Sequence, residues 1–539
     1  MDPIFFAVFM TLFAGVFSFI AFLGYKKTKT ADDYYVAGRS MGSIVIAFSY
    51  GATFISAVAL IGFSGISSVF GHSILWLAFL NIGIGILIAF VFYGFRTRKM
   101  GLSLNAVTLP ELLGNRFNSS KLQASSGLII AVFMVFYTTA VFLAISTLFQ
   151  ETFGIPYWIC VVVFTIVVGI YLLIGGLYAV MWTHAIQGIL MLTGMLILTI
   201  GVYVMLGGIG PAHEVTAALT PDMLSSIGSP AATSAPNGLT SMPPVGSAPF
   251  MLLLTLVFGV GIGVLAQPQL IVRYLSAKSE KALRRAIPYG GIFILLMTFT
   301  AFSVGPLCNE LMVNAPKYNS ALTDSLMYPT KIVAGNAVPN PDAVVPLIIN
   351  NFFPTWFIIL FLFAVLAAAM STASALFHTA GASIGRDVCE KGLMKGCSEK
   401  KSLKITRMAT LVIVGATLII SLNPPAVVAI LTSFFFGLMA CTFLAPYTLT
   451  LYWKKISRAG AWAGMLGGFI FTMLWYIHIY FKTAPQIIGN SLTDNILINM
   501  LDPIFIGLPL SFLLCIIVSK FILQDKEEIK IMEKAFENI

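Results

Sequence analysis

The chain has 539 residues, of which 58% are hydrophobic and only 10% are charged. Soluble domains carry about 25% charged residues, so this composition excludes a soluble enzyme or binding domain and predicts a polytopic membrane protein. The formal net charge of +10 does not indicate a nucleic-acid partner, because the basic residues follow the alternation that membrane topology requires.

Apolar runs long enough to cross a bilayer predict thirteen spans in all-α architecture. In chain order they are 3–24, 42–70, 74–95, 124–149, 156–180, 184–208, 249–272, 286–307, 345–380, 406–423, 425–450, 460–481 and 501–521. The first span lacks a small-residue cleavage pattern before Lys26, and we expect it to be retained.

An odd number of spans places the two termini on opposite sides of the cell membrane. With the N-terminus outside and the C-terminus in the cytoplasm, all but three of the 31 Lys and Arg residues lie inside. The exceptions are Lys317, Lys331 and Lys482. The six cysteines lack a C-x-x-C pair, so neither a metal site nor a disulfide framework is indicated.

Two long external loops, 209–248 and 308–344, are interpreted as flexible connections, and the mixed-charge tail at 522–539 as a solvated cytoplasmic helix. No soluble catalytic domain and no obligate protein partner are evident. Function is therefore expected within the membrane bundle, with lipid around it.

Ionisable side chains within spans are the usual sign of a proton relay or buried metal centre. No acidic residue, Lys or Arg falls near the middle of a predicted span. His184 and His378 lie near span ends and are interpreted as hydrogen-bonded structural residues.

The second span contains the stretch "FSYGATFISAVALIGFSG" from Phe48 to Gly65, which is rich in Gly, Ser and Thr. An interrupted helix would free backbone carbonyls for a cation within the bilayer. Small-residue helix packing needs the same composition. The stretch alone leaves both interpretations open.

Two further stretches favour the interrupted helix. In "FAVLAAAMSTASALFH", Ala368, Ser371 and Thr372 are spaced to lie on one helix face, where they could either pack or complete an all-neutral cation site. In "FGVGIGVLAQPQLIVRYL", glycines precede Gln267 and Pro268. This second interruption follows the first by five spans, as the internal symmetry of inverted-repeat transporters predicts.

The segments "DDYYVAGRSMG" (32–42) and "TLYWKKISRAGAWAGMLGGFI" (450–470) resemble the sodium:solute symporter family. The second fits its longer signature through Lys455, Gly460, Ala461 and the glycines that follow. The resemblance covers nearly the whole chain and implies a transporter rather than an enzyme.

The resemblance implies about thirteen transmembrane helices around a leucine-transporter-type core of two inverted five-helix repeats. The implied parts are an extra helix at 1–24, repeats at 42–208 and 249–450, two helices at 460–521 and a tail at 522–539. It implies Na+ as coupling ion, no other cofactor, and a sodium site formed by Ala52, Ile55, Ala368, Ser371 and Thr372. Because that site is neutral, we expect electrogenic uptake unless a monoanion moves with one Na+.

Departures from the family pattern concern the substrate. Phe54 stands where the proline transporters are acidic, His184 where many members carry Asp, and Val260 and Val264 where the proline site has Trp and Tyr. The residues expected to line the substrate site are Phe54, Ser56, Tyr137, Thr138, Val260, Val264 and Gln267.

This lining suits a small solute with one polar end, taken up with Na+ by alternating access. A monocarboxylate is the first expectation, with proline second and pantothenate third. A membrane sensor or channel-like protein on the same fold, and proton instead of sodium coupling, are the alternatives.

Overall fold

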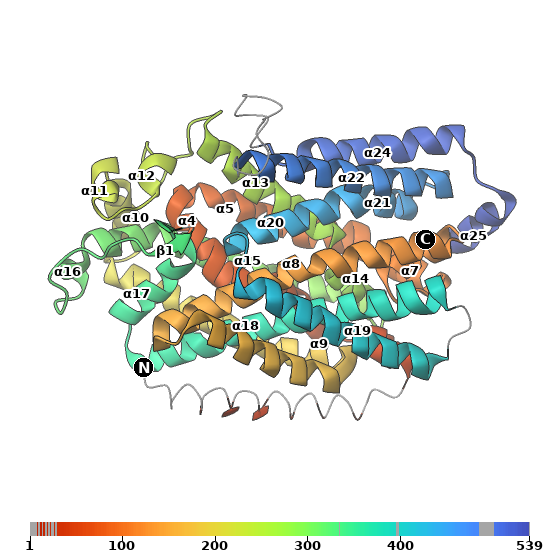
Figure 1. Ribbon diagram of the computed structural model, residues 1–539, viewed down its shortest axis with the longest axis horizontal. Coiled ribbons are helices and arrows are strands. Elements are labelled where there is room, and N and C mark those ends of the chain that lie inside the picture. The colour runs from red at the N-terminus through yellow and green to blue at the C-terminus, as the bar shows by residue number, and fades with distance from the viewer. Residues whose placement is uncertain are drawn as a thin grey trace.

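The protein is described from a computed structural model, which is almost entirely helical (Figure 1). The structure describes residues 30–333, 335–394, 398–483 and 501–537, with scattered positions between 8 and 26. Within this part of the chain, ten helices are long and apolar enough to cross a membrane, which supports a multi-pass membrane protein. The predicted span at 3–24 lies outside the described residues apart from those scattered positions, and the total of thirteen stays a prediction.

The first half of the chain forms the following elements, where η marks 3₁₀- and π-helical segments. They are α2 (Ala31–Val36), η1 (Ala37–Arg39), α3 (Ser43–Phe54), η2 (Val58–Phe63), α4 (Ser64–Phe70), η3 (Gly71–Ile74), α5 (Leu75–Ile82), η4 (Gly83–Gly94), α6 (Phe95–Ser103), α7 (Leu109–Arg116), α8 (Ser120–Phe153), α9 (Tyr157–Met205), α10 (Ile209–Ala217), α11 (Pro221–Ser226) and α12 (Ala231–Ser234). Element α9 covers two of the predicted spans, 156–180 and 184–208.

The second half contains one antiparallel hairpin and the remaining helices. They are α13 (Ala248–Gly263), η5 (Val264–Ala266), α14 (Pro268–Leu275), α15 (Glu280–Val313), α16 (Ala315–Tyr318), β1 (Thr330–Val333), β2 (Asn336–Pro339), η6 (Pro341–Ala343), α17 (Val344–Phe352), α18 (Thr355–Ala382), η7 (Ser383–Leu393), α19 (Glu399–Leu422), α20 (Val428–Met439), η8 (Ala440–Leu444), α21 (Ala445–Tyr452), α22 (Arg458–Thr483), α24 (Ile504–Phe521) and α25 (Lys526–Phe536). The hairpin pairs Thr330 with Pro339 and Val333 with Asn336.

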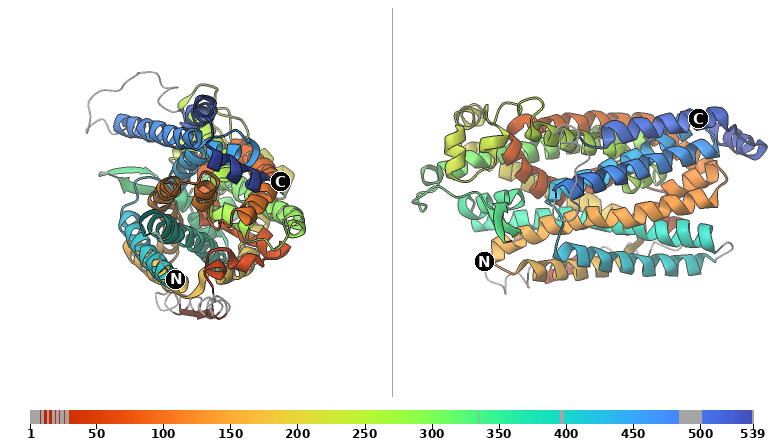
Figure 2. Two further views of the ribbon diagram at one scale, coloured as in Figure 1. Left: turned by 90° about the vertical axis from the view of Figure 1, so that its right-hand side faces the viewer. Right: turned by 45° about the horizontal axis from the view of Figure 1, so that its top comes forward.

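The long helices run side by side along the longest axis of the molecule (Figure 1), and the end-on view shows them as one bundle (Figure 2). At its centre α18 packs against α8, α9 and α3, and α3 also packs against α15. The pair α22 and α24 lies outside this centre, against η8 and α21. The helices that carry the predicted site are therefore the innermost ones.

Both predicted helix interruptions are present. Helix α3 ends at Phe54, and Ile55 is extended before η2 begins. Helix α13 ends at Gly263, and after η5 the extended Gln267 precedes Pro268 at the start of α14. A residue before proline disfavours helical backbone, and proline suits the first turn of a new helix, so the second break follows directly from the sequence.

The two loops predicted to be external differ from the expected flexible connections. Segment 209–248 contains α10, α11 and α12, and segment 308–344 contains the end of α15, α16, the hairpin and η6. These elements gather at one end of the bundle, and α25 lies at the opposite end (Figure 1). Leu219, Leu224 and Leu239 form a small buried cluster, which explains why the first loop is folded.

The C-terminal helix is present as α25, but it is not wholly solvated. Its Glu528 is buried and, with Asp525, pairs with Arg458 at the start of α22. Helix α25 also contacts α6 and α7.

Candidate functional site

The residues of the predicted sodium site meet where α18 crosses the broken end of α3. The Ser371 hydroxyl donates to the carbonyl oxygens of Ala52, at 2.8 Å, and Ala368, at 2.9 Å. The Thr372 hydroxyl donates to the carbonyl of Thr53 at 3.2 Å and lies 3.4 Å from that of Ala52. Two hydroxyls and the carbonyls of two helices thus converge on one place.

Ile55 supplies the remaining predicted ligand. Its backbone amide donates to Gly51 at 2.7 Å and closes the last turn of α3. No hydrogen bond to the Ile55 carbonyl occurs in the described part of the chain, because the helix stops there. The five predicted residues are all at most 2% exposed, so they offer neutral oxygens to a desolvated cation.

A small cavity of about 20 Å³ lies beside this place. Its walls come from α3, η2, α5, α8, α13, α15 and α20, and every lining residue is buried. The lining residues are Phe54, Ile55, Ser56, Val58, Ala59, Phe63, Leu77, Asn81, Tyr137, Val260, Phe302, Thr432 and Phe436. This is room for about one water molecule, so binding of an organic solute needs the lining side chains to move apart.

Four of the seven predicted substrate residues line the cavity: Phe54, Ser56, Tyr137 and Val260. Aromatic rings form much of its wall. The ring of Phe436 lies 5.2 Å from that of Tyr137 and 6.4 Å from that of Phe54. The cavity is therefore flanked by apolar surfaces with hydroxyls between them.

Thr138, Val264 and Gln267 do not line the cavity. The Thr138 hydroxyl donates to the Met134 carbonyl of its own helix. The Gln267 side chain donates to the Gly263 carbonyl at 3.0 Å and thereby satisfies the end of the broken α13.

Sequence reasoning missed Asn81, Thr432 and Phe436 in the cavity wall. Asn81 is 2% exposed, and its side-chain Oδ1 has no hydrogen-bond partner. Its position in the middle of an apolar span was the available signal. An unpartnered acceptor in a cavity wall is a group that a ligand can satisfy.

The structure also buries ionisable groups that the sequence placed at span ends. Arg273 and Asp387 are 0% exposed and Asp502 is 3% exposed. Arg273 lies in the last turn of α14, Asp387 within η7, and Asp502 shortly before α24. His184 and His378 are hydrogen bonded as expected, His184 to Ser374 at 3.0 Å and His378 to the Tyr34 carbonyl at 2.8 Å.

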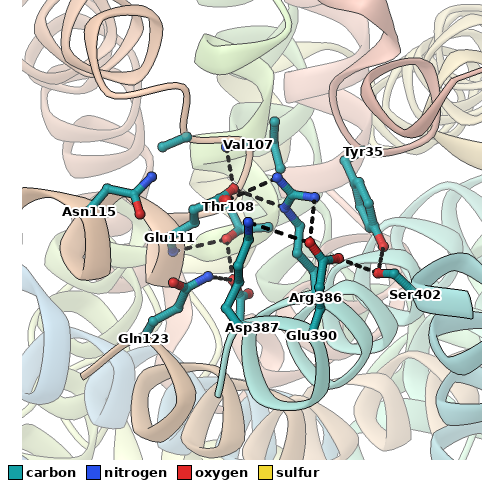
Figure 3. Close-up of polar contacts among 12 residues, drawn as sticks. Tyr35, Val107, Thr108, Glu111, Asn115, Gln123, Arg386, Asp387, Glu390 and Ser402 are labelled. Carbon is teal, nitrogen blue, oxygen red and sulfur yellow. Dashed lines mark hydrogen bonds and ion pairs between the residues drawn. The ribbon is translucent and has the colours of Figure 1, made fainter. Parts of the chain in front are cut away.

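An ionic cluster joins η7 to α7 and α8 (Figure 3). Arg386 of η7 donates to both carboxylate oxygens of Glu111 of α7, at 2.9 and 3.0 Å. The neighbouring Asp387 accepts from Thr108 and from Gln123 of α8, both at 2.8 Å. These bonds fasten η7, the continuation of α18, which carries three residues of the predicted sodium site, to α7 and α8.

A second small cavity lies between this cluster and the sodium-site helices. Its lining includes Thr108, Pro268, Val272, His378 and Ser383. This second cavity shares Thr108 with the ionic cluster and His378 with α18, the helix that carries Ala368, Ser371 and Thr372.

Comparison with known proteins agrees with this architecture. The family model for the sodium:solute symporter family matches residues 34–468. The sodium/proline symporter of Staphylococcus aureus (strain JH9) is 30% identical over 85% of this chain and 83% of its own length. The osmoregulated proline transporter OpuE of Bacillus subtilis (strain 168) is 27% identical over 85% of both chains.

Among solved structures, a substrate-bound, outward-open Na+-coupled sialic acid symporter matches 96% of this chain and 97% of its own, with a TM-score of 0.70 and 18% identity. At that identity the likeness shows the fold, a leucine-transporter-type helical core. The chain belongs to the sodium:solute symporter family, with Na+ as its coupling ion.

Proposed function

We propose that this protein is a symporter that uses the Na+ gradient to import proline or a closely similar small amino acid by alternating access. The expectation of a monocarboxylate substrate finds no support in the comparisons, in which similar proteins are named as proline transporters. Those relatives share 27–30% identity with this chain, enough to suggest a substrate class.

The observation that carries the amino-acid proposal is the unpartnered Oδ1 of Asn81 in the cavity wall. A monocarboxylate without a hydroxyl group has no donor for this acceptor, and lactate has only its hydroxyl, whereas the charged ammonium or imino group of an amino acid is a stronger donor. Ser56 and Tyr137 add hydroxyls to the cavity wall, and the Ile55 carbonyl is free for the ion. The apolar part of the solute would lie against Phe54 and Phe436.

The sodium site is proposed at Ala52, Ile55, Ala368, Ser371 and Thr372, because their oxygens converge without a carboxylate. A zwitterion moved with Na+ carries net positive charge, so proline uptake should be electrogenic. A monocarboxylate moved with one Na+ would be electroneutral. We also propose that the end bearing α10–α12 is external and that the end with the ionic cluster is cytoplasmic.

The test is uptake of labelled proline, lactate and pantothenate into proteoliposomes with an inward Na+ gradient. We expect accumulation of proline that rises with an inside-negative potential. Accumulation of lactate alone, independent of potential, would instead support the monocarboxylate alternative. Uptake driven by a proton gradient without Na+ would contradict sodium coupling.

Asn81→Leu provides the internal check on the amino-acid assignment. It should raise the KM for proline while leaving the Na+ concentration for half-maximal uptake unchanged at saturating proline. Thr255→Val is a matched control, because its hydroxyl bonds within its own helix to Met251 and it does not line the cavity.

A further inference from the structure

Arg273 is the buried cation that the transport site leaves unexplained. It lies in α14, after the break that separates this helix from α13, and its side chain is 0% exposed. Arginine is almost never fully buried in proteins without a partner for its charge. The guanidinium stays protonated even there, because its pKa is too high to release the proton.

The partners of Arg273 do not neutralise this charge. Its Nη2 donates to the Thr53 hydroxyl at 3.0 Å and lies 3.5 Å from Nδ1 of His184. Its Nε and Nη1 have no hydrogen-bond partner. In the part of the chain that the structure describes, no carboxylate forms an ion pair with Arg273.

The surrounding groups are neutral. His184 is 0% exposed, and its Nδ1 lies 3.3 Å from the Ser49 hydroxyl and 3.2 Å from that of Thr53. Its Nε2 lies 3.0 Å from the Ser374 hydroxyl. Hydroxyls can orient toward either charge, so this environment tolerates an anion but does not supply one.

The unpaired charge is directly connected to the sodium site. Thr53 accepts from Arg273 through its hydroxyl and from Thr372 through its carbonyl. Two positive charges that contact the same buried residue repel each other. Na+ binding at Thr372 is therefore opposed by Arg273 unless something offsets the guanidinium charge.

We propose that a small inorganic anion of the size of chloride binds at Nε and Nη1 of Arg273 and raises the affinity of the neighbouring site for Na+. The anion accepts from the two unpartnered N–H donors and reduces the repulsion between Arg273 and the ion. This inference rests on the proposed sodium site but not on the identity of the organic substrate.

The first experiment uses the purified full chain in detergent without organic substrate. Thermal unfolding is followed while the Na+ concentration is raised, in one series with sodium chloride and in another with sodium gluconate, at constant ionic strength. We expect the midpoint of the Na+-induced stabilisation to lie about tenfold lower in chloride, the usual size of coupling between two sites. Equal midpoints in both salts would overturn the anion site, whereas no Na+ effect in either salt would overturn the sodium site itself.

A substitution at His184 separates charge pairing from other effects of the salts. His184→Asp places a carboxylate beside Arg273, so its Na+ midpoint should be low and equal in chloride and gluconate. The matched variant His184→Asn lacks the charge and should keep the difference between the two salts. If both variants depend on chloride as the wild type does, the proposal is wrong.

Arg273→Gln gives an independent measurement should the His184 variants fold poorly. Without the guanidinium, the Na+ midpoint should no longer depend on chloride. A remaining chloride dependence in this variant would place the anion elsewhere and refute the site. If proline added to the wild type in gluconate lowers the Na+ midpoint as much as chloride does, the guanidinium binds the substrate carboxylate. This result would also refute the anion site.

Discussion

Replacing Thr372 with valine tests the sodium site most directly, because valine keeps the shape of the side chain and removes only its hydroxyl. A hydrogen bond or contact of a hydroxyl to a charged group contributes about 1.5–3 kcal/mol, and one between neutral groups about 0.5–1.5 kcal/mol. In the Na+-bound state, Thr372→Val loses the contact of the hydroxyl with the charged ion. Without Na+, the bond to the Thr53 carbonyl at 3.2 Å is lost instead.

The difference between these two losses sets the expected effect. About 1–1.4 kcal/mol of Na+ binding free energy should disappear, which corresponds to a five- to tenfold rise in the Na+ concentration for half-maximal uptake. The assay is initial uptake into proteoliposomes as Na+ is varied, supported by the Na+-induced shift of the Tm.

Thr298→Val is the matched control for this prediction. Thr298 is also 0% exposed, and its hydroxyl donates at 2.7 Å to Ile294 of its own helix, far along the chain from the site. Its Na+ dependence should equal that of the wild type. A Thr372→Val protein with the same Na+ dependence as this control would refute the proposed role of the hydroxyl.

Three further predictions concern the cavity, the ionic cluster and the outer end. Phe436→Ala removes an aromatic wall and should raise the KM for the organic substrate about 2- to 10-fold in uptake kinetics, with the Na+ half-saturation unchanged. Glu111→Gln weakens the pair with Arg386 and should loosen η7, so the half-buried Cys389 of η7 should react faster with a maleimide, as followed by mass spectrometry. An unchanged reaction rate would contradict the view that this pair holds η7 in place. Burial raises the pKa of Asp342 from 3.8 to about 6, and its bond from the Val428 amide only partly offsets this. Because the folded state favours the neutral acid, the stability from Asp342 is full below about pH 4 and is lost by about pH 6. The Tm of the wild type should fall relative to Asp342→Asn across that window, and parallel curves would refute the assignment.

Much of the sodium site follows from local sequence. The spacing of Ala368, Ser371 and Thr372 places their oxygens on one helix face whatever the rest of the fold does. The break at Gln267–Pro268 follows from the backbone restrictions of proline. Long-range packing was still needed to bring α18 against Ala52.

The substrate cavity was harder to predict, because its residues come from seven elements. Thr138 is adjacent to Tyr137 in sequence but lies on another side of α8, where its hydroxyl bonds to Met134. Asn81 and Thr432 lie in ordinary apolar spans, and only the approach of α5 and α20 to the broken α3 places them in the cavity wall.

The sequence by itself determined the membrane class, the two helix interruptions and the neutral chemistry of the residues proposed for the sodium site, since these depend on composition and on backbone and side-chain preferences within one segment. The tertiary structure decided which side chains face the cavity and which charges are buried. Arg273 shows the physical reason: a charged residue at a span end looks solvent-exposed in sequence, but the break before α14 turns it into the bundle beside Thr53 and His184.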